Sequence, residues 1–89
     1  MQEIDYYRTQ SGLTDETLSL ADYEYEYFKN VSGLPDGLAI DDYKQKFFFD
    51  ETGFPMYTDG EYWYYANETG NTDFKLSLED LKRIFFDMQ

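Results

Sequence analysis

The sequence predicts an α+β fold: an N-terminal helix, an antiparallel β-meander of about four strands, and a C-terminal helix packed on the sheet. Three observations support this prediction. A helix-length segment lies between Ser19 and Gly33, short aromatic runs separated by turn residues follow Asp41, and an apolar stripe with helical spacing follows Ser77. Because 89 residues leave no room for a second core, we expect one domain over residues 1–89.

The first helix is predicted from its two ends. Ser19 and Asp22 are typical of a helix start, because the serine side chain accepts hydrogen bonds from first-turn amides and the aspartate lies near the positive end of the helix dipole. Gly33 is typical of a helix end. A strand is the competing interpretation of residues 22–27, where acids and tyrosines alternate. We favour the helix, since a strand would explain only the middle of the segment.

The sheet is predicted from aromatic runs. Residues 46–53 and 63–70 are alike, because each aromatic run ends in Asp or Asn followed by Glu-Thr-Gly. Asp59-Gly60 is a strong signal for a two-residue hairpin turn, since glycine accepts the positive φ that such a turn requires. The predicted strands cover residues 43–49, 54–58, 61–66 and 72–76, and residues 35–37, Pro-Asp-Gly, connect the first helix to them.

The C-terminal helix is predicted to begin at Ser77, where Ser77-Leu78-Glu79-Asp80 is a variant of the capping box. An apolar stripe follows with helical spacing and would pack on the sheet. The stripe consists of Leu78, Leu81, Ile84, Phe85 and Met88.

The charge balance is strongly acidic. Nineteen Asp and Glu stand against seven Lys and Arg, which gives a formal net charge of −12. Direct nucleic-acid binding is disfavoured, because neutralising phosphates requires a basic surface. Disorder is disfavoured too, because aromatic residues make up 21% of the chain and can form a core.

The chain contains neither His nor Cys, so the usual general base, zinc ligands and thiol nucleophile are missing. The pairs Asp41-Asp42 and Asp50-Glu51 are expected by chance in so acidic a chain. No segment has the acid spacing of a calcium-binding EF-hand loop or the glycines of a phosphate-binding loop. The sequence therefore predicts no enzyme, no catalytic residues, no metal site and no cofactor.

No signal-peptide pattern opens the chain, and no run of 18 apolar residues could cross a membrane. We therefore expect a cytoplasmic protein without a membrane partner.

The acids are the better candidates for function. Carboxylates at i and i+4 of a helix, or i and i+2 of a strand, lie about 6 Å apart, which is comparable with the phosphate repeat of a nucleic-acid strand. Interleaved tyrosines would add contact area of the kind enriched at binding hot spots. The alternative is that the tyrosines form core and the acids a solvated surface. The predicted partner-binding residues are Asp22, Tyr23, Glu24, Tyr25, Glu26, Asp41, Asp42, Asp50 and Glu51.

These features lead to a functional hypothesis. Small size and uncompensated acidity are shared with DNA mimics of phages and mobile elements, such as many anti-CRISPR and anti-restriction proteins. Such a protein would occupy the basic groove of a nucleic-acid-binding host defence or DNA-processing protein. The alternatives are an immunity protein or antitoxin that covers a basic nuclease toxin, and an interaction domain without an inhibitory role. A salt-adapted source would also select an acidic surface.

One segment suggests a different function. Residues 59–65, Asp-Gly-Glu-Tyr-Trp-Tyr-Tyr, together with Gly70, resemble one hairpin of the choline- and glucan-binding modules of bacterial surface proteins. A degenerate copy without Trp covers residues 47–53. The resemblance implies that aromatic side chains form a cage around a ligand.

Overall fold

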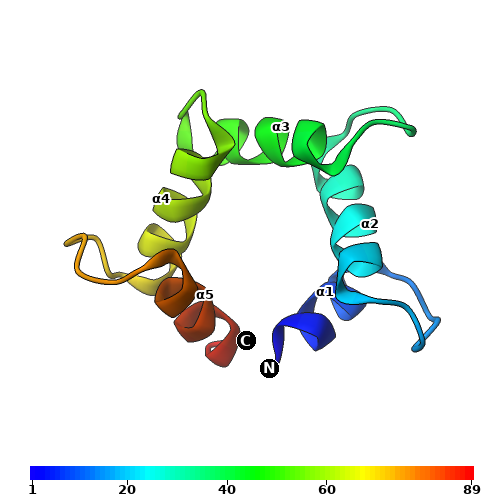
Figure 1. The fold of residues 1–89 in the computed structure, drawn as a ribbon, viewed down its shortest axis with the longest axis horizontal. Coiled ribbons are helices and arrows are strands. Elements are labelled where there is room, and N and C mark those ends of the chain that lie inside the picture. Colours follow the sequence, from blue (N-terminus) through cyan, green and yellow to red (C-terminus); the bar gives the residue numbers. More distant parts are fainter.

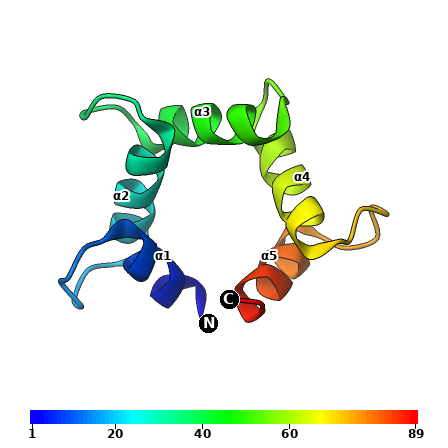
Figure 2. The same cartoon turned by 180° about the vertical axis from the view of Figure 1, so that it is seen from behind.

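A computed structural model describes all 89 residues, which form five α-helices and no strand. The helices follow one another around a ring, with the loops outside and the two termini side by side (Figures 1 and 2). Each helix packs against the next one in the sequence. The N-terminal ammonium closes the ring by donating a hydrogen bond to the Phe86 carbonyl oxygen at 2.9 Å. The helices are α1 (Glu3–Ser11), α2 (Leu20–Ser32), α3 (Ile40–Thr52), α4 (Tyr57–Thr69) and α5 (Leu78–Asp87).

The predicted α+β fold with its meander is therefore wrong. Residues 43–49 lie within α3 and residues 61–66 within α4, while 54–58 cover the α3–α4 loop and the start of α4, and 72–76 lie in the α4–α5 loop. Of the aromatic residues that suggested strands, Phe47, Phe48 and Tyr65 are buried in the core, whereas Phe49 and Phe74 are exposed. Aromatic preference for strands reflects packing on a half-buried surface, and the inner side of this ring satisfies it equally well.

The predicted hairpin turn at Asp59-Gly60 lies inside α4 instead. Gly60 has a steric role there, because a Cβ atom would lie 2.9 Å from Thr52 Oγ1 and 3.0 Å from Phe48 Cβ. The missing side chain lets α4 approach α3 closely, which explains the glycine without a turn.

Both predicted helices are confirmed. Ser19 Oγ accepts a hydrogen bond from the Asp22 N–H at 3.2 Å, the Asp22 carboxylate accepts one from the Ser19 N–H at 3.1 Å, and Gly33 follows the helix with φ 72°. Residues 22–27 are thus helical, which excludes the strand interpretation. At the other end Ser77 Oγ accepts from the Asp80 N–H at 3.2 Å, and α5 packs on α4 rather than on a sheet.

The ring is built from a degenerate repeat. Four segments, residues 6–12, 27–33, 47–53 and 64–70, share the pattern of two aromatic residues, three others, then Ser or Thr and Gly. Helix α5 contributes a fifth aromatic pair. The second aromatic of every pair is buried in one common core, and the rings meet edge to face or at tilted angles rather than face to face. These five residues are Tyr7, Phe28, Phe48, Tyr65 and Phe86.

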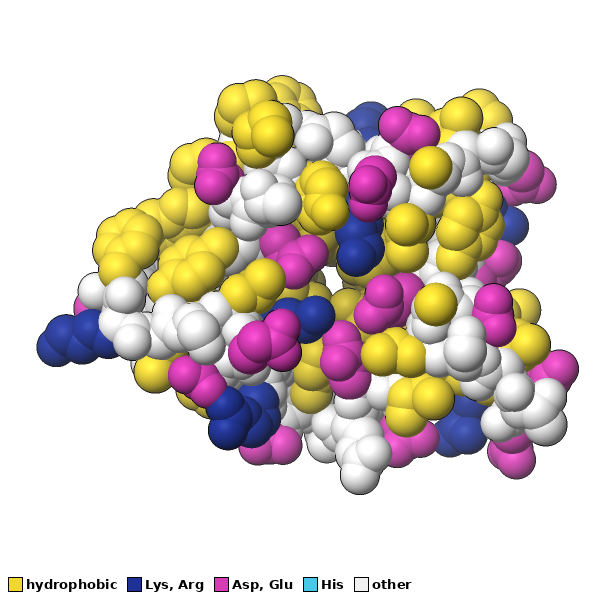
Figure 3. Space-filling model, in the orientation of Figure 1, with side chains coloured by type: hydrophobic (Ala, Val, Ile, Leu, Met, Phe, Trp, Pro, Cys, Tyr) yellow, Lys and Arg dark blue, Asp and Glu magenta, His cyan; other side chains and the backbone are white.

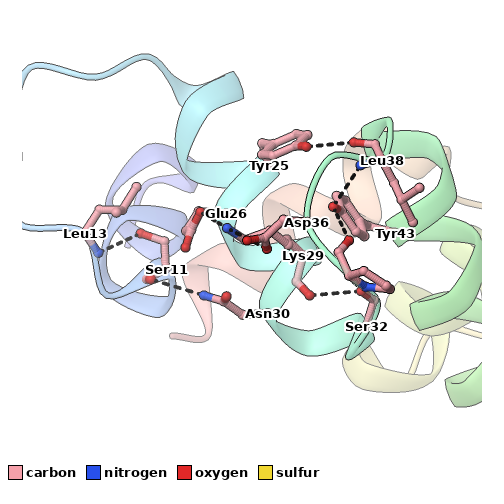
Figure 4. Close-up of polar contacts among 11 residues, drawn as sticks. Ser11, Leu13, Tyr25, Glu26, Lys29, Asn30, Ser32, Asp36, Leu38 and Tyr43 are labelled. Carbon is pink, nitrogen blue, oxygen red and sulfur yellow. Dashed lines mark hydrogen bonds and ion pairs between the residues drawn. The ribbon is translucent and has the colours of Figure 1, made fainter.

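The hydroxyl residue of the repeat ends each of the first four helices. Ser11 Oγ donates to the Arg8 carbonyl at 2.8 Å and accepts from the Leu13 N–H at 3.2 Å, and Ser32 makes the corresponding pair of bonds. Figure 4 shows the Ser11–Leu13 and Ser32–Lys29 contacts. The following glycine takes the left-handed conformation, in which L side chains are strained. Each unit can therefore turn sharply into the next loop.

The longer loops are held by tyrosine hydroxyls. Tyr23 donates to the Asp15 carbonyl in the α1–α2 loop, and Tyr62 donates to the Leu76 carbonyl in the α4–α5 loop at 2.8 Å. In the α2–α3 loop, Tyr43 donates to the Pro35 carbonyl at 2.8 Å, and Figure 4 shows this contact region. Three of the four loops are thus tied to the helices by tyrosine hydrogen bonds. None of the five helices has the length and apolar character needed to cross a membrane.

Candidate partner-binding surface

Most carboxylates have no cationic partner. Six of the 19 lie in ion pairs with Lys or Arg, which leaves 13 unpaired, and 11 of these belong to exposed residues. The exposed unpaired acids are Asp15, Glu16, Asp22, Asp41, Asp42, Glu51, Asp59, Glu68, Asp73, Glu79 and Asp87.

The predicted residues of α2 point in different directions. Tyr23 is 1% exposed and belongs to the core, while the Asp22 carboxylate is engaged in the capping box. Glu26 Oε2 lies 3.0 Å from Lys29 Nζ, and the Tyr25 hydroxyl donates to the Leu38 carbonyl at 2.7 Å (Figure 4). The helix therefore does not present these side chains as one row of charges.

Glu24 belongs instead to a group of mixed charge. Burial raises the pKa of Glu24, and the positive charge of Lys44 partly opposes that increase. Burial alone would lower the pKa of Lys82, but Glu3 at 3.2 Å raises it above its usual value. Figure 3 shows acidic and basic side chains intermingled near the middle of one face of the molecule. The negative charge of Glu61 also acts on Glu24 and on Lys82, and it raises the pKa of each. Three carboxylates, Glu3, Glu24 and Glu61, thus act on the same region as two ammonium groups, Lys44 and Lys82, so the net charge of the group is small.

The predicted residues of α3 separate into its two ends. Asp41 and Asp42 are exposed in the first turn. Asp50 pairs with Lys46, whereas Glu51 is exposed in the last turn and has no ion pair. Of these four, only Glu51 lies near the tyrosines described next.

A second set of groups lies beside the aromatic core. Tyr6, Tyr27 and Tyr64 are the first members of their aromatic pairs and are half-buried. Burial raises the pKa of all three phenols, and the negative charges of Glu51 and Glu68 add to the effect. The hydroxyls are protonated at neutral pH, as a phenol with an ordinary pKa of about 10 already is. We call these five residues the carboxylate–tyrosine face.

Glu61 and Glu68 show why the two charged groups are separate. They are seven residues apart on α4, which corresponds to about 10 Å along a helix. Tyr65, between them, is influenced by Glu61, whereas Tyr64 is influenced by Glu68. Within the aromatic pair of α4, Glu61 thus acts on the second tyrosine and Glu68 on the first.

The acids of the carboxylate–tyrosine face are not explained by helix stability. Helices α3 and α4 have no basic residue in the last turn, where the negative end of the dipole disfavours a carboxylate. Glu51 and Glu68 occupy that turn and face no cation. By contrast, Asp41 and Asp42 stabilise the positive end of α3.

Sequence reasoning missed four of the five residues of this face, namely Tyr6, Tyr27, Tyr64 and Glu68. A usable signal was present: the aromatic pair five residues before each Ser/Thr-Gly marks the inner side of every helix. The irregular spacing of the repeats, with glycines at positions 12, 33, 53 and 70, hides it.

The fold and this surface define a small, acidic, all-helical protein. No group of three or more His, Cys, Asp or Glu is placed to hold a metal ion. Comparison of the chain with protein-family models, with curated proteins and with solved structures found no match.

Proposed function

We propose that this protein binds the basic, nucleic-acid-binding surface of another protein and inhibits it by occupying that surface. The observation that carries the proposal is the set of 11 exposed carboxylates without cationic partners on a compact frame. The electrostatic field of these carboxylates attracts a basic surface over about one Debye length, roughly 8–10 Å at physiological salt. The same field repels nucleic acid.

The carboxylate–tyrosine face is the proposed centre of contact. Glu51 and Glu68 offer acceptors for Lys and Arg, and the neighbouring phenols offer hydrogen bonds and flat apolar area. Because the aromatic core fixes the ring positions, binding costs little side-chain entropy. Acids at positions that destabilise a helix are also expected where selection acts on function rather than on stability.

The proposal is tested by capture and competition. The immobilised chain is incubated with a lysate of its source cells at low salt, and bound proteins are released with duplex DNA or with an uncharged polymer of equal mass concentration. We expect DNA to release specific basic proteins that the uncharged polymer leaves bound. If DNA releases nothing that the uncharged polymer does not, the proposed function is wrong.

A further inference from the structure

An aromatic groove lies away from the carboxylate–tyrosine face, between the α3–α4 loop, α4 and the α4–α5 loop. It has a volume of about 560 Å³ and is lined mainly by four aromatic residues. The rings of Phe54 and Trp63 are parallel within 1°, with centroids 6.1 Å apart, and Phe74 stands at 87° to Trp63 at 4.9 Å. Tyr62 is parallel to Phe74 within 5° and is held in place by its bond to the Leu76 carbonyl.

The groove exposes apolar surface, most of all at Phe74. Phe74 is 66% exposed and is the only residue other than glycine with a positive φ, 62°. The left-handed conformation disfavours a side chain with a Cβ atom. The chain therefore holds a large aromatic ring at the surface, in a disfavoured backbone conformation, beside three other aromatic rings.

One charge lines the groove, the carboxylate of Asp59. The equivalent Asp in the first turn of α2, Asp22, is engaged by Ser19, and that of α5, Asp80, pairs with Arg83. Asp59 follows an N-cap, Met56, that has no side-chain hydroxyl, and it takes part in no ion pair of the chain. Aromatic ring faces and a free carboxylate both attract a cation.

We propose that this groove holds an arginine side chain of the basic partner, with the guanidinium stacked on the aromatic rings and paired with Asp59. The inference rests on the proposed function, which supplies a basic protein as the partner. Arginine fits better than lysine, because its planar guanidinium stacks on aromatic faces and pairs with a carboxylate through two hydrogen bonds. The volume also leaves room for the backbone that carries the side chain.

Trp63 makes the test specific, since it is the only tryptophan of the chain. The intact protein is titrated with a capped hexa-arginine peptide, and tryptophan fluorescence and heat of binding are followed. Hexacitrulline, which is neutral but similar in shape, and hexalysine are the comparison peptides. We expect a saturable fluorescence change with hexa-arginine, a weaker one with hexalysine, and none with hexacitrulline.

Two variants and one matched control locate the effect. Asp59→Asn and Phe74→Ala should each weaken hexa-arginine binding about fivefold, which is within the range of cation–π and exposed charge contacts. Asp42→Asn makes the same charge change at the equivalent position of α3, outside the groove, and should weaken binding less than about twofold.

The outcomes separate this inference from the proposed function. The groove is not the arginine site if calorimetry detects hexa-arginine binding while Trp63 fluorescence does not change. The same conclusion follows if Asp59→Asn and Asp42→Asn weaken binding equally. Neither result contradicts the proposed function. Equal responses to hexalysine, or any response to hexacitrulline, would overturn the assignment to arginine. If DNA releases nothing in the capture experiment, the function itself falls.

Discussion

The two ends of the helices carry the same kind of charge with opposite consequences. In the first turns, Asp22, Asp41 and Asp42 lie at the positive end of a helix dipole, and Asp22 also completes a capping box. In the last turns, Glu51 and Glu68 lie at the negative end without a cation nearby. The fold accounts for the first group and not for the second. Acidity that the fold explains should be separated from acidity that it does not before a binding surface is assigned.

The frame that holds both groups should depend on the aromatic core. Phe48 is 1% exposed and packs against Phe28, Phe47 and Tyr64. Phe48→Ala should lower the free energy of unfolding by about 3–5 kcal/mol, because it removes a large buried ring and leaves a cavity. Urea denaturation followed by circular dichroism measures the loss. A change below about 1 kcal/mol would mean that the ring is not a packed core.

The cap of α2 tests the stabilising role of the first turns. Ser19→Ala removes the acceptor of the Asp22 N–H and should cost about 1 kcal/mol. Ser77→Ala removes the corresponding acceptor at α5 and serves as the parallel measurement by thermal melting. Unchanged stability in both variants would show that the helix starts do not depend on their caps.

Glu24 gives a smaller, pH-dependent effect. Burial raises its pKa in the folded state above the unfolded value of about 4.3. A raised pKa contributes stability below the unfolded pKa, and this contribution is lost as the pH rises through the folded pKa. Glu24→Gln should therefore match the wild type in acid and be more stable at neutral pH. Melting curves from pH 4 to pH 7 test this, and a variant less stable at pH 7 would contradict the assignment.

Part of the fold could be predicted from the sequence. The start of α2 at Ser19, its end before Gly33, and the start of α5 at Ser77 depend on local hydrogen bonds and backbone conformation, which neighbouring residues determine. The middle of the chain could not be predicted in this way. Phe47-Phe48 and Tyr64-Tyr65 suit a strand or a buried helix face equally, and only contacts between distant helices decide.

The candidate surface was predictable in composition but not in position. The charge of −12 indicates uncompensated carboxylates, and Glu51 was among the predicted residues. Glu68 is 17 positions later in the sequence, and Tyr6 belongs to α1 at the chain's start. Closure of the helical ring brings these groups to one face, and no local pattern specifies that closure.

The most direct test compares two double variants with the same change of net charge. Glu51→Gln with Glu68→Gln removes last-turn acids, and Asp41→Asn with Asp42→Asn removes first-turn acids at the far end of α3. The first variant should equal or exceed the wild type in stability, with a gain of about 0.3 kcal/mol per site. The second variant should be less stable than the wild type by a similar amount.

The measurement is the amount of partner protein that each immobilised variant retains, quantified after release with duplex DNA. We predict that the Glu51→Gln with Glu68→Gln variant retains about tenfold less partner protein than the wild type, equal to about 1.4 kcal/mol. The Asp41→Asn with Asp42→Asn variant should retain nearly the wild-type amount. Equal retention by the two variants would contradict the claim that the carboxylate–tyrosine face contacts the partner.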